Sequence, residues 1–173
     1  MFLPTGRCSL FKTQTNKVFM IQFKSPSDRK NLLDRFRKLT PDTAPAFGLM
    51  TAQHMVEHVC LTFSMSNGRM EIAQTTPERL ANITKRRLLE SDMAFPKGFK
   101  APILPENETL PYQYESLNAA IDVLEEEIDA FEGWFQHYPG SRPIHPVMGP
   151  LTYDEWQVFH SKHLTHHLEQ FGV

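Results

Sequence analysis

The most regular pattern in this chain is a row of large apolar side chains between residues 116 and 138. They recur at intervals of three and four positions, so they all fall on one side of an α-helix. A helix with a continuous apolar side must bury that side against other elements. The pattern therefore predicts a core helix over 116–138, with its buried face formed by Leu117, Ile121, Leu124, Ile128, Phe131 and Phe135.

Capping signals predict helices elsewhere in the chain. Ser25 or Ser27 can cap a helix before an apolar series, and Thr51 can cap the next one, which Asn67 and Gly68 suit as an end. Thr76 before Pro77 is typical of a shorter helix that follows. Thr152 and Glu155 have the spacing of a capping box. The helices predicted in this way span 27–39, 51–66, 77–90 and 152–171.

These elements predict an all-α fold, a four-helix bundle with 77–90 as an accessory short helix. The only strand candidate is "KVFMIQF" at 17–23. Residues 92–114 contain four prolines and no periodicity, which predicts a long, ordered crossover. We expect this crossover to span one end of the bundle and to help wall its interior.

Composition excludes several classes of protein. The 173 residues fit one domain, and 18 basic against 20 acidic residues give no electrostatic case for nucleic-acid binding. The short "KRR" run at 85–87 is typical of a solvated helix face. No apolar run is long enough for a membrane span, and two cysteines without a CxxC motif suggest no disulfide framework. We therefore expect a cytoplasmic protein with no nucleic-acid or membrane partner.

The N-terminal region differs from the rest. Residues 1–24 are fairly apolar, but Pro4, Arg7 and Lys12 interrupt them and no small-residue cleavage site follows, so we expect no signal peptide. We interpret residues 1–24 as a loosely ordered extension and 25–173 as a single domain. Whether Met20 is an alternative start stays open.

Histidines are concentrated in the last predicted helix, in "HSKHLTHHLEQF" at 160–171. On a helix, His160, His163 and His167 lie within a band of about 60°, on the side that should enter the core. His166 points away from this band, at its edge. Imidazole in the middle of a buried helix face requires an explanation.

Two histidine pairs have the spacing that favours metal binding. His163 and His167 are four positions apart, and so are His54 and His58 on the helix over 51–66. Such pairs bring their Cβ atoms within about 5–6 Å, and facing helices can then gather three or four imidazoles around one ion. A hydrogen-bonded set of neutral core histidines is the competing interpretation.

Other residues favour chemistry less. Cys60 lies about 200° around the helix from His58, which suggests a small buried hydrophobe. The acidic run that includes Glu127 should form a solvated face. His145, in "HPVMGP", can close a pocket or stabilise a turn, and both roles stay open.

Two segments carry a family resemblance, "LTPDTAPAFGLMTAQHMVEHV" at 39–59 and "HPVMGPLTYDEWQVFHSKHLTHHLEQFGV" at 145–173. They resemble the DinB-like superfamily of metal-binding four-helix bundles, which includes YfiT-type hydrolases and thiol-dependent transferases. The chain is more narrowly similar to a branch known only as a domain of unknown function. The resemblance covers about residues 27–173.

The resemblance implies a metal site of three ligands, His58, His163 and His167. His54 and His160 would line the same cavity, with His145 as a further candidate. Three imidazoles with open coordination positions are typical of a catalytic site rather than a closed structural one. The implied cofactor is a divalent metal, with zinc or nickel ahead of iron or manganese.

Two functions follow as expectations. The first is a metal-dependent enzyme that transfers a small thiol or hydrolyses its substrate, with no catalytic base identified. The second is a non-catalytic metal-binding or interaction bundle. The expected partner is a small molecule, with a low-molecular-weight thiol as a candidate, and a homodimer stays open.

Overall fold

The structure is a computed structural model that describes residues 20–97 and 110–173. Its helical elements over these ranges confirm the all-α class, while the bundle of DinB type stays a prediction. The strands are two residues each and pair antiparallel, so they add only a hairpin. The elements in chain order are α1 (Pro26–Phe36), α2 (Ala52–Ser66), α3 (Glu78–Leu89), α4 (Leu117–His137), β1 (Ile144–His145), β2 (Gly149–Pro150) and α5 (Tyr153–Phe171).

The predicted caps explain where most helices begin. Ser25 and Asp28 form a capping box at α1, Thr51 accepts from the amide of His54, and Thr152 opens α5 with its own capping box. The exception is α3, which begins after Pro77 without a side-chain cap. Helix α3 is correspondingly the least buried of the five described helices.

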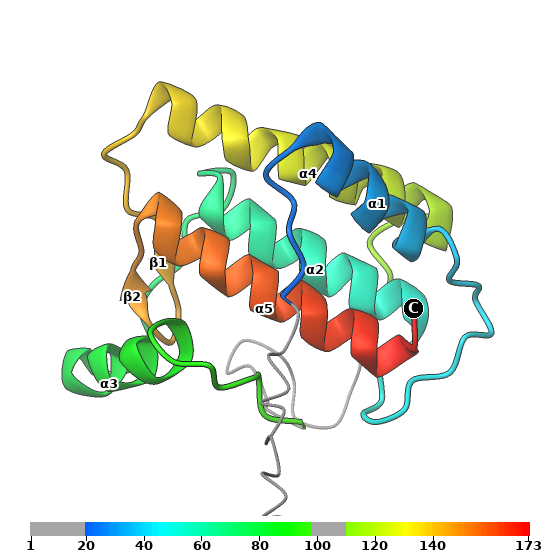
Figure 1. The fold of residues 1–173 in the computed structure, drawn as a ribbon, viewed down its shortest axis with the longest axis horizontal. Coiled ribbons are helices and arrows are strands. Elements are labelled where there is room, and N and C mark those ends of the chain that lie inside the picture. The colour runs from blue at the N-terminus through cyan, green and yellow to red at the C-terminus, as the bar shows by residue number, and fades with distance from the viewer. Residues whose placement is uncertain (1–19, 98–109) are drawn as a thin grey trace, which may run out of the picture.

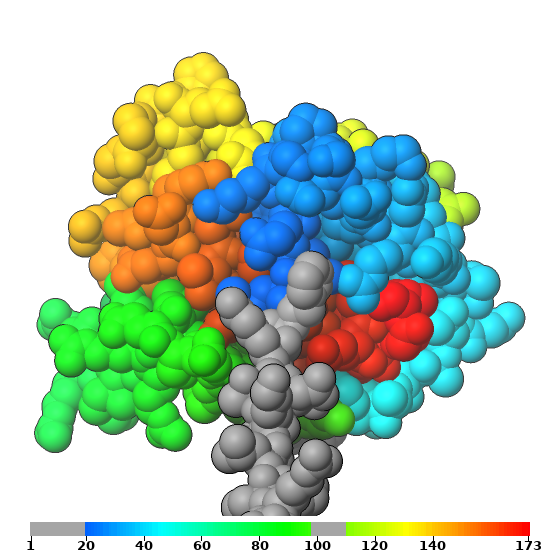
Figure 2. Space-filling model, in the orientation of Figure 1, coloured from blue at the N-terminus to red at the C-terminus, as the bar shows by residue number. Residues whose placement is uncertain are grey.

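Figure 1 shows α1, α2, α4 and α5 lying alongside one another, with α3 and the β1–β2 hairpin at one end of α5. Helix α2 packs against both α4 and α5, and α3 packs against α5 and β2. In the space-filling view, α3 forms a separate corner of the face that is shown (Figure 2). Side chains from α2, α3 and α5 together line a cavity.

The predicted apolar side of α4 is buried as expected, against α2 and the aromatic centre of the core. Residues before α1 also contribute, because Ile21 and Phe23 are buried and the Ile21 amide donates to Thr165 Oγ1 at 2.9 Å. The packed domain therefore begins before the predicted boundary at 25. Residues 20–23 form no strand, and the rest of the strand candidate lies outside the described residues.

The predicted solvated face of α4 is wrong at one residue: Glu125, Glu126 and Asp129 are exposed as expected, but Glu127 is not. Glu127 is buried instead of solvated, because its carboxylate accepts hydrogen bonds from Asn67 Nδ2 at 2.5 Å and Arg69 Nη1 at 2.7 Å. Both partners come from the turn that follows α2. Glu127 therefore ties the turn after α2 to helix α4.

Candidate metal centre

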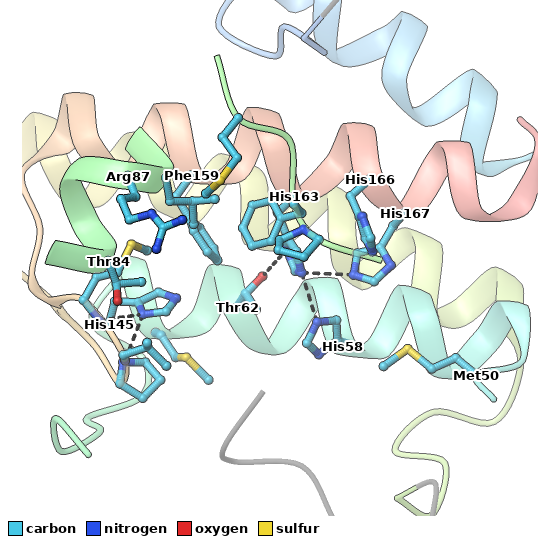
Figure 3. Close-up of a pocket in the computed structure, with 18 residues that line it drawn as sticks. Met50, His58, Thr62, Thr84, Arg87, His145, Phe159, His163, His166 and His167 are labelled. Atoms are coloured by element: carbon cyan, nitrogen blue, oxygen red, sulfur yellow. Dashed lines mark hydrogen bonds between the residues drawn. The ribbon is translucent and has the colours of Figure 1, made fainter. Parts of the chain in front are cut away.

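Three histidines from two helices converge in the interior. The Nε2 atom of His163, on α5, lies 3.0 Å from Nε2 of His58 on α2 and 3.0 Å from Nε2 of His167, one turn further along α5. The ligating nitrogens of all three lie within 4.8 Å of one another (Figure 3). Nitrogens around a tetrahedral zinc ion are roughly 3.3 Å apart, given Zn–N bonds of about 2.0–2.1 Å. The three side chains can therefore share one ion.

Gln170 fixes the orientation of His167. The Gln170 side-chain amide donates to the carbonyl of Phe47 at 2.7 Å, so its oxygen faces the histidine. That oxygen lies 2.8 Å from His167 Nδ1 and can only accept. The ring proton of neutral His167 is therefore assigned to Nδ1, and its Nε2 lone pair points at the other histidines.

Thr62 fixes the orientation of the His163 ring. The Thr62 hydroxyl donates its proton to the carbonyl of Val59 at 2.8 Å, so its oxygen accepts from His163 Nδ1 at 3.4 Å. The His163 Nε2 lone pair is then free as well. Hydrogen bonds to the remote nitrogen that fix the ring and its tautomer are the usual support of a metal-bound histidine.

His58 is held less firmly. Its Nδ1 is buried and has no hydrogen-bond partner among the described residues. Its Nε2 lies 3.0 Å from that of His163, while the Nε2 atoms of His163 and His167, both assigned as unprotonated, lie 3.0 Å from each other. A cation between them would remove the repulsion of their lone pairs and take the third lone pair from His58.

Burial keeps all three imidazoles neutral. It lowers the pKa of His58 to about 4 and that of His167 to about 3, with the neighbouring imidazoles adding to the effect. The pKa of His163 is lowered well below its usual value for the same reasons. Neutral imidazole is the form that ligates a metal.

The three histidines lie on the wall of a cavity of about 290 Å³. Apolar side chains such as Phe159, Leu88 and Met148 form most of that wall. None of the described lining residues is an aspartate or glutamate, and Arg87 is the one lysine or arginine among them. The candidate metal site is thus open to a mainly apolar space that can hold a small molecule.

Two further histidines line the cavity without belonging to the ligand cluster. His145 lines the cavity and also stabilises its turn, because its Nδ1 accepts from the amides of Val147 and Met148 at 3.1 and 3.3 Å. His166, predicted to point away, lines the cavity too but stands outside the ligand cluster.

His54 and His160, predicted to line the cavity, lie outside its wall in the structure. His54 stacks on Tyr112 and contacts the carbonyl of Leu110 through Nε2, so it holds the segment that follows residue 109. His160 is a core residue whose ring stacks on Phe63 with centroids 3.8 Å apart.

The described part of the predicted crossover does wall the cavity. Met93, Phe95 and Pro96 line it, whereas residues 98–109 lie outside the described residues. Lys162 on α5 anchors this wall, because its Nζ donates to the carbonyls of Leu88, Ser91 and Met93 at 2.6–3.0 Å. The buried Lys162 ammonium thus caps the carbonyl end of α3 and positions the segment that follows it.

Cys60 is excluded as a nucleophile by its surroundings. The thiol is buried and lies 3.5 Å from the carbonyl of Ala120. Burial raises its pKa to about 12, with nearby carboxylates adding to the effect. The prediction of a small buried hydrophobe is confirmed.

Sequence reasoning missed three residues at the site. Thr62 and Gln170 share helix faces with the histidines, but their hydrogen bonds to Nδ1 atoms depend on tertiary packing. Arg87 is exposed, as predicted for a solvated helix face, but its side chain also lines the cavity. Only the position of α3 against α5 shows that this side chain lines the cavity.

The chain belongs to the family described as "Protein of unknown function (DUF1569)", which matches residues 56–172. All three candidate ligands fall within the matched segment. No curated protein and no solved structure matches the chain. Over the described residues, no helix is both long enough and apolar enough to cross a membrane.

Proposed function

We propose that this protein is a metal-dependent enzyme of the DinB-like type that uses His58, His163 and His167 as ligands and acts on a small molecule. The observation that carries the proposal is the pair of Nε2 lone pairs on His163 and His167, fixed toward each other from outside by Thr62 and Gln170. The HxxHH sequence at 163–167 and its resemblance to the DinB-like superfamily support the same conclusion.

The open cavity favours chemistry over a purely structural ion. A structural zinc site is normally closed by a fourth protein ligand, whereas here three imidazoles border a space of about 290 Å³. A divalent ion, zinc or nickel first, would lower the pKa of a coordinated water or thiol and make it a nucleophile. The mainly apolar walls would favour an apolar second reactant.

Thiol transfer is the reaction we favour, with hydrolysis as its variant. The thiol loses its proton to solvent water and its sulfur forms a bond to an electrophilic carbon. The bond between that carbon and the leaving group breaks, and the leaving group departs with the bonding electrons. No carboxylate among the described lining residues offers itself as a general base. Coordination to a metal would lower the pKa of the thiol, so its deprotonation would depend less on a general base.

An assay with two arms tests the proposal. Zinc-loaded protein is incubated with cysteine and a chloro-dinitrobenzene, and separately with a nitrophenyl ester without thiol. Thioether formation that is lost in His163→Ala supports transfer, and ester hydrolysis lost in the same variant supports hydrolysis. If metal binds but neither reaction depends on His163, the non-catalytic metal-binding bundle is the better account.

A further inference from the structure

The cavity has two chemically different ends. Figure 3 shows the three metal-site histidines at one end, and Arg87, Thr84 and His145 at the other. All six line the same space. Between the two ends the wall is mainly apolar and includes Phe159, with Thr62 as a polar side chain (Figure 3).

Arg87 and Thr84 present one face of α3 to this second end. They are three positions apart, which places them one above the other on the helix. Arg87 makes no ion pair with any described residue, and no acidic side chain lines the cavity in the ranges that the structure describes. Its positive charge is therefore available to a ligand.

His145 adds a directed hydrogen-bond donor. Two backbone amides donate to its Nδ1, so the ring proton is assigned to Nε2. Burial lowers the pKa of His145 to about 3, so the ring stays neutral and keeps this single proton. Packing against Phe159, with centroids 4.7 Å apart, holds the ring at the cavity wall.

We infer that Arg87, Thr84 and His145 form a carboxylate-binding subsite, so the substrate is a small carboxylic acid whose reacting group reaches the histidine end through an apolar linker. A guanidinium supplies two parallel donors that match a carboxylate, and a hydroxyl and an imidazole N–H can complete the contact. The absence of acidic residues among the described lining residues removes competition for those donors. The part of the inference that concerns the reacting group rests on the proposed function.

The subsite can be tested without any metal. The full chain is titrated with hexanoate and with neutral hexanol, followed by NMR chemical shifts. We expect Arg87→Gln to weaken hexanoate binding about fivefold to tenfold and to leave hexanol binding unchanged. Arg86→Gln, on the same helix but outside the cavity wall, should change neither, and Thr84→Val should weaken hexanoate binding less than Arg87→Gln.

Three results would overturn the subsite: no saturable binding of hexanoate, no loss in Arg87→Gln, or an equal loss in Arg86→Gln. A second titration with mercaptohexanoate and one equivalent of zinc tests the histidine end separately. In the presence of zinc, mercaptohexanoate should bind the wild-type protein more tightly than hexanoate does, and this difference should be lost in His163→Ala. If zinc does not bind, the proposed function fails, while the metal-free titration still decides the carboxylate subsite.

Discussion

His163 and His167 face each other with their Nε2 atoms 3.0 Å apart, and each ring is held from behind through Nδ1. Two neutral imidazoles that both carry their proton on Nδ1 cannot hydrogen-bond through Nε2. The contact is therefore between lone pairs, which a shared cation would stabilise. This relationship makes the site a candidate metal centre and not only a cluster of buried histidines.

Gln170 should control metal affinity without being a ligand. Replacing it with methionine removes the acceptor for His167 Nδ1, and we expect zinc affinity to fall by about 10- to 100-fold. Gln157→Met on the same helix is the matched control, because Gln157 is also buried but bonds to Glu132 and Tyr153 and does not line the cavity. Competition with a chromogenic chelator measures both. Equal affinities in the two variants would show that Gln170 does not support the site.

The sequence predicted the helices because caps and apolar periodicity are local signals. These local signals could not predict that the histidines of helix α5 have two different structural roles. His160 stacks in the aromatic core, whereas His163 and His167 border a cavity, and the tertiary packing around α5 decides between these roles. The ligand set itself came from the family resemblance, since spacing alone left His54 and His58 equivalent.

His160 should make the fold sensitive to acid. Burial lowers its pKa well below the usual value, so below pH 6.5 the unfolded chain takes up a proton that the folded protein does not. Stability contributed by the neutral ring is complete above pH 6.5 and is lost as pH falls, by about 1.4 kcal/mol per pH unit. Urea unfolding of wild-type and His160→Phe proteins measures the difference.

In His160→Phe, the stacking on Phe63 is kept but the titrating group is gone. Its free energy of unfolding should fall less steeply between pH 6.5 and pH 5 than that of the wild-type protein. The difference in unfolding free energy between the two proteins at pH 7.5, where His160 is neutral in both states, measures the change in packing alone. Parallel slopes in the two proteins would mean that His160 is protonated equally in the folded and unfolded states.

Lys162 should stabilise the cavity wall. Lys162→Met leaves the carbonyls of Leu88, Ser91 and Met93 without their shared donor, and we expect a loss of about 1–3 kcal/mol in unfolding free energy. Amide hydrogen exchange should accelerate at residues 88–95 more than in α4. Lys30→Met, which breaks an exposed pair with Asp34, should change the unfolding free energy much less than Lys162→Met. Unchanged exchange at 88–95 would contradict the anchoring role.

Gly68 should tolerate no side chain. Its φ is +73°, and a Cβ there would lie 2.5 Å from the ring of Trp134. We expect Gly68→Ala to lower the free energy of unfolding by about 1–3 kcal/mol. Gly140→Ala is the control, because a Cβ at Gly140 meets nothing within 4 Å. Similar thermal midpoints for the two variants would show that the turn after α2 can rearrange.

The metal content of purified protein, measured by element-resolved mass spectrometry on a chain without a histidine tag, tests the central claim most directly. We predict one divalent ion per chain in the wild-type protein and in His166→Ala and His54→Ala. The same measurement should find almost none in His163→Ala or His167→Ala, and a marked loss in His58→Ala. Metal that persists without His163 and His167, or that disappears with His166 or His54, would contradict the assignment of the three ligands.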